Sequence, residues 1–143
     1  TVDILATDHA PHTREEKAKP YPASPSGMPG VQTLVPVMLD HVARGRLSLQ
    51  RLVDLTSAGP QRVFGLVGKG RIACGYDADL TIVDLAAERT IEDAQQASKV
   101  GWTPFHGMRV RGWPVMTVVR GQVVMRDGEI RGEPRGRPMR FLP

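Results

Sequence analysis

The chain has 143 residues, of which 41% are hydrophobic and 24% are charged. This composition is close to that of an ordinary soluble domain, and the length suffices for a core. The 19 basic and 15 acidic residues give a formal net charge of +4. The excess arginine lies between Gly and Pro residues near the end of the chain, without interleaved aromatic residues, which favours a solvated tail over a nucleic-acid site.

A single cysteine, Cys74, excludes an internal disulfide and fits a reducing, cytoplasmic compartment. No apolar run approaches the roughly 20 residues of a membrane-spanning helix. No basic and then apolar leader opens the chain. The first residue is not Met, which agrees with a fragment or a processed product. We therefore expect a cytoplasmic protein without membrane or nucleic-acid partners.

The first predicted element is a short buried strand over residues 2–6, followed by an acidic and His-rich loop at residues 7–12 (TDHAPH). Strand alternation puts Ile4, Ala6 and Asp8 on one face. If the strand belongs to a parallel α/β barrel, Asp8 lies at the mouth and points inward. A carboxylate there can bind a metal ion or move a proton. The spacing alone equally allows an ordinary strand end, with Asp8 capping a turn.

Residues 13–30 are predicted to form a long loop that is rich in Pro and Gly and leaves this rim. Thr13 and Glu16 are spaced as a capping box for one helical turn. Gly27 lets the backbone come close to a ligand, although a plain turn glycine explains it equally.

Three helices follow. Gly45 ends the first as a C-cap, Ser48 caps the second, and Pro60 suits the first turn of the third, after a break at residues 57–60. Residues at helical spacing form the apolar stripe of the first helix: Val31, Leu34, Val35, Met38 and Val42. His41 lies between these apolar positions and is read as a surface or partly packed histidine.

Beyond Gly68, short β-branched runs between Gly and Asp turns predict a small antiparallel sheet. The runs are residues 80–83, 89–91, 116–119 and 122–125. Residues 120–122 and 126–129 are typical of hairpin turns. We expect one open sheet edge, a loop or packing role for His106, and an extended or disordered tail at residues 132–138.

Three motifs resemble one family. Residues 8–13 (DHAPHT), followed by Glu15-Glu16-Lys17, are similar to the last active-site motif of dihydroorotases, which belong to the amidohydrolase superfamily of metal-dependent (β/α)8-barrel enzymes. Residues 26–36 (SGMPGVQTLVP) resemble the Gly-rich loop and helix start that come next. Residues 102–107 (WTPFHG) and 112–121 (GWPVMTVVRG) resemble the C-terminal tail of the family.

The resemblance implies an α/β fold that is the C-terminal fragment of a TIM barrel plus part of a β-sandwich. Residues 1–66 would supply the last barrel strand, the active-site loop and the helices, and residues 67–143 the β-rich portion with its tail. A complete (β/α)8 barrel takes roughly 250 residues. The family's other metal ligands are a His-x-His pair, a carboxylated lysine and two further histidines on earlier strands. None of the four histidines here forms a His-x-His pair. We therefore expect an incomplete and inactive portion of a larger enzyme, whose partner is the missing N-terminal portion.

The activity implied by the resemblance is the reversible hydrolysis of L-dihydroorotate to N-carbamoyl-L-aspartate in pyrimidine biosynthesis, with one or two zinc ions in the whole enzyme. By the resemblance, Asp8 is metal ligand and general base and acid, His12 contacts the substrate carboxylate, and the backbone at Ser26 and Gly27 holds the substrate ring. The family often has an aromatic or aliphatic residue in place of Ser26, and Glu in place of Gln32.

Three alternatives remain open. The first is another cyclic amidase, such as a hydantoinase or allantoinase, against which His12 argues. The second is a non-catalytic dihydroorotase-like subunit that scaffolds aspartate transcarbamoylase, against which the retention of Asp8 and His12 argues. The third is a free-standing binding module. The expected partners are a small-molecule substrate, the missing portion, and either a second copy of the enzyme or aspartate transcarbamoylase.

Overall fold

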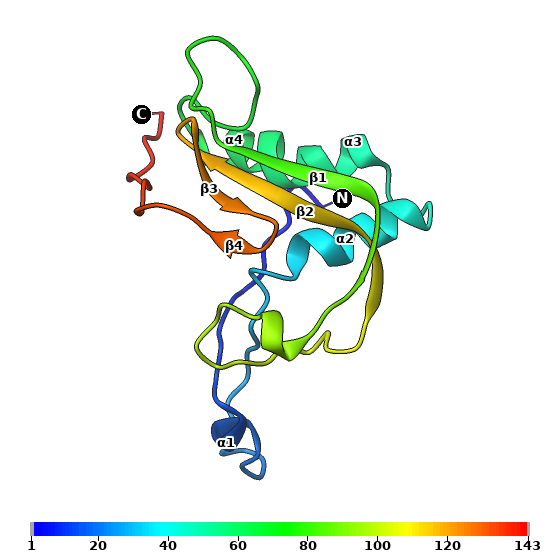
Figure 1. Ribbon diagram of the computed structural model, residues 1–143. Helices are drawn as coiled ribbons and strands as arrows, with labels where there is room; N and C mark the ends of the chain where they lie inside the picture. Colours follow the sequence, from blue (N-terminus) through cyan, green and yellow to red (C-terminus); the bar gives the residue numbers. More distant parts are fainter. Residues whose placement is uncertain (1, 143) are drawn as a thin grey trace.

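The β-rich half of the chain forms one four-stranded antiparallel sheet. In the computed structural model, which describes residues 2–142, its strands are β1 (Leu80–Thr90), β2 (Arg109–Val119), β3 (Gln122–Arg126) and β4 (Glu129–Ile130), in the order β1-β2-β3-β4. Both predicted hairpin turns are confirmed. Arg120-Gly121 and Asp127-Gly128 have positive φ at every position, between 52° and 88°, as two-residue turns of the favoured hand require. The sheet lies over a layer of helices (Figure 1).

The first strand is longer than the sequence indicates. Two predicted runs merge into β1, because irregularities in its pairing with β2, between Ile82 and Val83 and between Asp84 and Glu88, accommodate residues 84–88 between them. The Asp84 side chain accepts the backbone N–H groups of Ala86 (2.8 Å) and Ala87 (3.2 Å), which replace ladder hydrogen bonds at this bulge.

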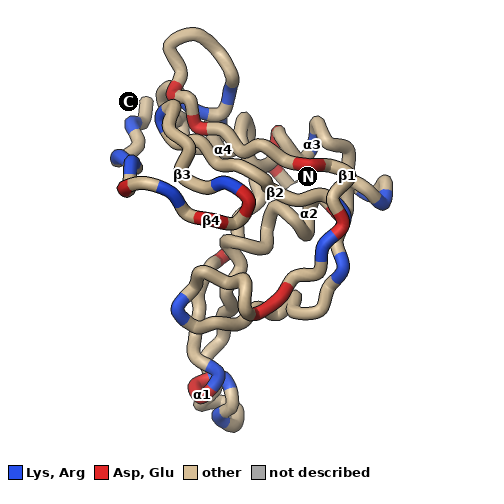
Figure 2. The backbone as a smooth tube through the Cα atoms, in the orientation of Figure 1, with Lys and Arg blue, Asp and Glu red and all other residues tan. Residues whose placement is uncertain are grey.

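An ionic cluster fastens the turn before β1 to the β2–β3 hairpin. Lys69 Nζ pairs with Asp77 at 2.9 Å and also with Asp79, and Asp79 accepts the backbone N–H of Arg120 at 2.7 Å. The hydrogen bonds to Asp79 and Asp77 raise the pKa of Lys69, so the ammonium stays charged. Figure 2 shows acidic and basic positions close together at the upper end of the sheet.

The helices are α1 (Arg14–Lys17), α2 (Leu34–Ala43), α3 (Leu49–Val53) and α4 (Gly59–Phe64). The predicted N-terminal caps are confirmed: Thr13 and Glu16 form the capping box, and the Ser48 side chain accepts the N–H of Arg51. The C-cap of α2 is Arg44, one residue before the predicted Gly45, whose positive φ follows it. The predicted break at residues 57–60 is wrong, since the π-helical turn η1 (Asp54–Ala58) joins α3 to α4. Pro60 lacks the N–H that a regular α-helix would need there, and a π-turn accommodates such a gap.

The core lies where α2 packs against β2. Gly112 lies directly over Leu39, because a Cβ at position 112 would be 2.6 Å from the Cβ of Leu39. The buried face of α2 differs from the predicted stripe: Pro36, Leu39 and Asp40 are buried, while Val31 is 60% exposed. The helix therefore turns a neighbouring face toward the sheet. The other buried apolar side chains are Leu52, Leu55, Leu66, Ile91 and Val110.

The predicted strand at residues 2–6 is not formed within the described part of the chain. This segment runs along the helices instead: the Leu5 N–H donates to the Leu55 carbonyl at 3.0 Å, and the Arg51 guanidinium donates to the Val2 carbonyl. A strand exists only where a neighbouring strand pairs with it, and among the described residues none pairs with this segment.

The tail is extended and exposed over residues 132–138, as predicted. Its last residues return to the helices, where the Leu142 N–H donates to the Gly65 carbonyl (2.8 Å) and the Val67 N–H donates to the Arg140 carbonyl (2.9 Å). Within residues 2–142, no helix is long and apolar enough to cross a membrane.

Candidate functional site

Residues 7–12 and 26–30, here called the rim, lie side by side at the root of the projecting arm that carries α1 (Figure 1). The Ala10 N–H donates to the Met28 carbonyl at 3.1 Å, and His9 and Met28 form a parallel bridge. Gly27 has φ of 95°, and a Cβ there would lie 2.6 Å from the Ala10 carbonyl oxygen. The two halves of the rim can therefore meet only because position 27 has no side chain.

Asp8 lies on the rim with an exposed side chain. Its φ of 44° is in the left-handed region, which Asp tolerates better than most residues. This turn of the backbone ends the strand-like alternation that the sequence predicts for Ile4, Ala6 and Asp8. Among residues 2–142 no hydrogen bond or ion pair occupies the Asp8 carboxylate, so both of its oxygens are open to a ligand from outside this segment.

His9 has a structural role that the sequence did not reveal. Its Nδ1 accepts the backbone N–H groups of Gly30 (3.0 Å) and Val31 (3.3 Å). A neutral imidazole that accepts at Nδ1 carries its proton at Nε2. In this state His9 ties the two halves of the rim together and offers no lone pair to a metal ion.

His12 is half-buried, and its Nδ1 lies 3.4 Å from a carboxylate oxygen of Glu16, one helical turn further on. Glu16 is fixed by the capping box of α1. The hydrogen bond from the Thr13 backbone N–H, supported by the His12 side chain, outweighs the opposing effect of burial and holds the pKa of Glu16 below its ordinary value. An ionised carboxylate therefore stands behind the His12 ring and fixes its orientation.

Lys17 supports the second half of the rim from α1. Its ammonium donates to the carbonyls of Pro25 (2.7 Å) and Gly27 (3.2 Å), and its own carbonyl accepts the Ser24 hydroxyl at 3.0 Å. Ser26, which is exposed, lies between the two carbonyls that Lys17 holds. The family-like motif contains Lys17, but only its contacts reveal this role.

The described donors do not make a complete metal centre. Nowhere in residues 2–142 do three His, Cys, Asp or Glu side chains cluster as a metal site requires. A protein zinc site uses at least three protein ligands, and an Asp oxygen is an accepted one. The rim thus fits one ligand of such a site, Asp8, and needs others from outside the described residues.

Known proteins share this arrangement of sheet, helices and rim. The L-hydantoinase (dihydropyrimidinase) from Arthrobacter aurescens superimposes with a TM-score of 0.85 at 40% identity, over 92% of this chain and 30% of that one. The D-hydantoinase (dihydropyrimidinase) from Thermus sp. gives a TM-score of 0.85 at 36% identity, with the same coverage. The chain therefore has the fold of about 30% of each of these hydantoinases.

Sequence comparison agrees. The model of the amidohydrolase family matches residues 23–125. The dihydroorotase of Pyrococcus furiosus is 46% identical over 135 residues, which are 94% of this chain and 31% of that protein. The dihydroorotase of Halobacterium salinarum is 48% identical over 139 residues, or 97% and 32%. The chain belongs to the amidohydrolase family, and it spans about 30% of the length of the curated relatives that it matches.

Proposed function

We propose that the chain is the C-terminal portion of a dihydroorotase, which interconverts L-dihydroorotate and N-carbamoyl-L-aspartate in pyrimidine biosynthesis. The observation that carries this proposal is the rim, where the open carboxylate of Asp8 stands in one short segment with His12, opposite the Gly27 loop. Identity of 43–48% with eight dihydroorotases, over at least 90% of the chain, supports the same reaction.

The hydrolytic direction attacks a ring amide, whose carbonyl is a poor electrophile. A zinc ion, when bound, polarises this carbonyl and lowers the pKa of the attacking water. Asp8 serves as one zinc ligand, takes the proton of the attacking water and hands it to the ring nitrogen that leaves. His12 binds the substrate carboxylate, and the backbone at Ser26 and Gly27 holds the ring.

In this proposal residues 1–66 are the last strand of a (β/α)8 barrel with its active-site loop and helices, and residues 67–143 belong to a β-sandwich domain. The exposed apolar side chains Val53, Val63 and Phe64 of the helices would pack on the rest of the barrel, which is the chain's main partner. The single cysteine, Cys74, is unpaired and exposed, which suits the reducing cytoplasm where we place the enzyme.

A hydantoinase-type reaction is the second candidate, since the L-hydantoinase from Arthrobacter aurescens is 40% identical. The two candidates differ in what His12 must do. Dihydroorotate carries a carboxylate that His12 binds, whereas dihydrouracil, a substrate of the dihydropyrimidinase type, carries none. Substitution His12→Ala is expected to raise KM for dihydroorotate at least tenfold. Faster turnover of dihydrouracil than of dihydroorotate by the unaltered enzyme would favour the second candidate.

Asp8→Asn tests the reaction itself in the complete enzyme. An amide cannot take a proton from water, so kcat for dihydroorotate should fall by about a thousandfold or more. The matched control is Asp127→Asn, because Asp127 also has positive φ but lies in a hairpin turn of the sheet. Retention of full kcat by Asp8→Asn would contradict the proposal. Absence of turnover in the unaltered complete enzyme would favour a scaffold subunit of aspartate transcarbamoylase.

A further inference from the structure

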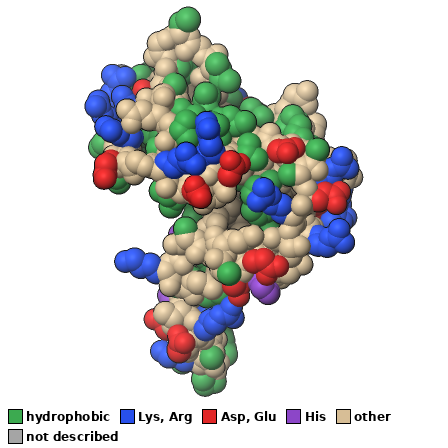
Figure 3. Space-filling view, in the orientation of Figure 1, with side chains coloured by type: hydrophobic (Ala, Val, Ile, Leu, Met, Phe, Trp, Pro, Cys, Tyr) green, Lys and Arg blue, Asp and Glu red, His purple; other side chains and the backbone are tan. Residues whose placement is uncertain are grey.

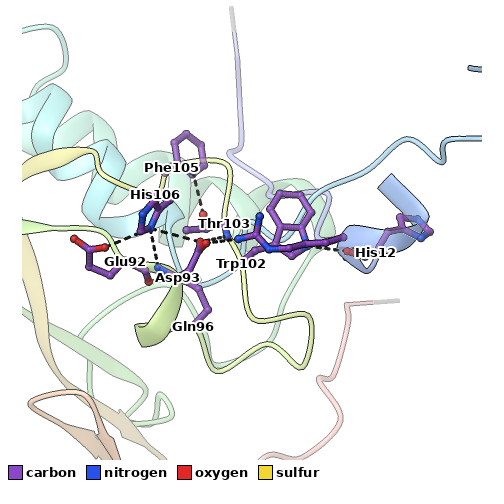
Figure 4. Close-up of polar contacts among 9 residues, drawn as sticks. His12, Glu92, Asp93, Gln96, Trp102, Thr103, Phe105 and His106 are labelled. Carbon is purple, nitrogen blue, oxygen red and sulfur yellow. Dashed lines mark hydrogen bonds and ion pairs between the residues drawn. The ribbon is translucent and has the colours of Figure 1, made fainter. Parts of the chain in front are cut away.

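The connection between β1 and β2, residues 91–108, reaches back to the arm that carries the rim (Figure 1). Figure 4 shows the side chain of Trp102, in this connection, directed toward the main chain of His12, which lies at the start of the arm. We call residues 92–106 the clamp. No chemistry proposed above uses any residue of this segment.

The clamp contacts the first half of the rim at His12 and the adjoining helix α1 at Arg14. The indole Nε1–H of Trp102 donates to the main-chain carbonyl of His12 at 2.8 Å, and the carboxylate of Asp93 pairs with the guanidinium of Arg14 (Figure 4). The first contact reaches the very residue that the proposed reaction uses to bind the substrate carboxylate. A fixed carbonyl fixes the backbone from which the imidazole projects.

The second half of the rim is held by the same segment. The side-chain amide of Gln32, two residues beyond Gly30, donates to the Gln95 carbonyl at 2.6 Å and accepts the Ala97 N–H at 2.8 Å. The clamp, a single segment of the β-rich half, is therefore hydrogen-bonded to the first half of the rim and to the chain just beyond the second half.

The clamp is itself held in place by internal hydrogen bonds and buried side chains. Asp93 accepts the Thr103 N–H at 2.8 Å, and the Asp93 N–H donates to His106 Nδ1 at 3.1 Å. Thr103 is only 4% exposed, and Ile91 at the entrance is 1% exposed. Because the neighbouring Thr103 is buried and its backbone is bonded to Asp93, Trp102 can hold His12 in place instead of following it.

We propose that Trp102 is a positioning residue for substrate binding. It holds the His12 carbonyl by a hydrogen bond and thereby fixes the orientation of the His12 side chain. This inference rests on the proposed function of His12. It predicts an effect on substrate affinity rather than on the chemical step, since Trp102 reaches neither Asp8 nor the attacking water by any contact among the described residues.

The test is Trp102→Phe, which keeps an aromatic ring and removes the N–H donor. In the complete enzyme, KM for dihydroorotate should rise about three- to tenfold, the usual size of one lost hydrogen bond, while kcat stays within twofold. The matched control is Trp113→Phe, because the ring of Trp113 in β2 lies against Arg89 and not against the arm. A KM that is unchanged by Trp102→Phe, or a kcat that falls as far as KM rises, would overturn the proposal.

Hydrogen–deuterium exchange separates this inference from the proposed function. Trp102→Phe should accelerate exchange of the amides in residues 9–19 severalfold and leave β2 and β3 unchanged, whether or not dihydroorotate is the substrate. Arg14→Gln removes the ion pair between Arg14 and Asp93, which is the exposed second contact of the clamp. Exchange in this variant tests the clamp even if Trp102→Phe fails to fold. Unchanged exchange in both variants would refute the clamp, whereas faster exchange without any dihydroorotate turnover would refute only the function.

Discussion

At the residue scale, the rim depends on one position without a side chain. Gly27 faces the Ala10 carbonyl so closely that any Cβ there would overlap it, and its φ of 95° is unsuited to other residues. The neighbouring contacts of Lys17 fix the loop on its other side. Substitutions at these positions are therefore expected to weaken the binding and turnover of the substrate more than the stability of the whole fold.

Gly27→Ala should lower kcat/KM for dihydroorotate at least tenfold, because the loop must move away from Ala10. The free energy of unfolding should fall by about 1–3 kcal/mol, since the positive φ is strained for Ala but the loop lies outside the core. Gly107→Ala is the control, with φ of 79° and no atom within 4 Å of the added Cβ. Steady-state kinetics and urea unfolding of both variants measure these effects. Equal losses of kcat/KM in the two would show that backbone strain, not the contact with Ala10, is responsible.

Lys17→Met keeps the apolar stem and removes the three donors of the ammonium. Without them the carbonyls of Pro25 and Gly27 lose their fixed partner, and the loop at residues 20–27 should become several times more susceptible to limited proteolysis. Lys19→Met, two residues further on, is the control, because no hydrogen bond of the Lys19 side chain appears among the described contacts. Identical cleavage rates for both variants would show that the hydrogen bonds of Lys17 do not hold the loop in place.

At the element scale, a buried carboxylate joins α2 to β2. Asp40 is 4% exposed and accepts the Arg44 guanidinium (2.6 Å) and the Arg111 backbone N–H (3.2 Å). Burial disfavours its charged form, but these hydrogen bonds outweigh burial and hold the pKa of the Asp40 carboxyl below its ordinary value of 3.8. A lowered native pKa means that the ionised group stabilises the fold above pH 3.8 and that this contribution is lost as the pH falls through the native pKa.

Asp40→Asn should therefore lower the free energy of unfolding by about 1–3 kcal/mol at pH 7, since hydrogen bonds to a charged group are lost. The difference from the unaltered protein should shrink as the pH falls below 3.8. Urea unfolding between pH 2.5 and 7 measures it, with the exposed Glu88→Gln in β1 as control, whose nearest cation, Arg109, is 3.9 Å away. A difference that is independent of pH would assign the cost to packing instead of charge.

Elements set by local chemistry could be predicted from the sequence. The hairpins follow from Asp-Gly and Arg-Gly turns, and Ser48 and Thr13 mark helix starts by their own hydrogen bonds. Elements that depend on partners could not: residues 2–6 have a strand-like pattern but find no strand to pair with. The site divides in the same way. Asp8 and His12 belong to a local motif, whereas the contact of Trp102 with His12 spans 90 positions and leaves no periodic signal.

At the scale of the whole molecule, apolar surface remains uncovered. Strand β1 is an edge of the sheet and exposes Leu80 (36%), Ile82 (39%) and Leu85 (47%). Figure 3 shows hydrophobic side chains gathered over the half of the molecule that holds the sheet, while the projecting arm carries mixed charges. An unpaired edge with apolar side chains favours pairing with another chain.

The 143-residue chain alone should therefore self-associate, and Ile82→Lys should reduce this by placing a charge on the edge strand. Ile72→Lys is the control, because Ile72 is 90% exposed in the loop before β1 and is not part of the edge. Light scattering after size-exclusion chromatography gives the mass of each species. A monomeric unaltered chain, or an equal effect of the two substitutions, would contradict the role of β1.

We propose that these residues carry one part of a dihydroorotase site and that the rest of the enzyme supplies the other part. The most direct test measures zinc content and dihydroorotate hydrolysis of the purified chain, before and after addition of the N-terminal portion of the enzyme. The chain alone should contain no zinc and show no turnover, and both should be recovered on addition of the N-terminal portion. Stoichiometric zinc and turnover by the 143 residues alone would contradict the proposal.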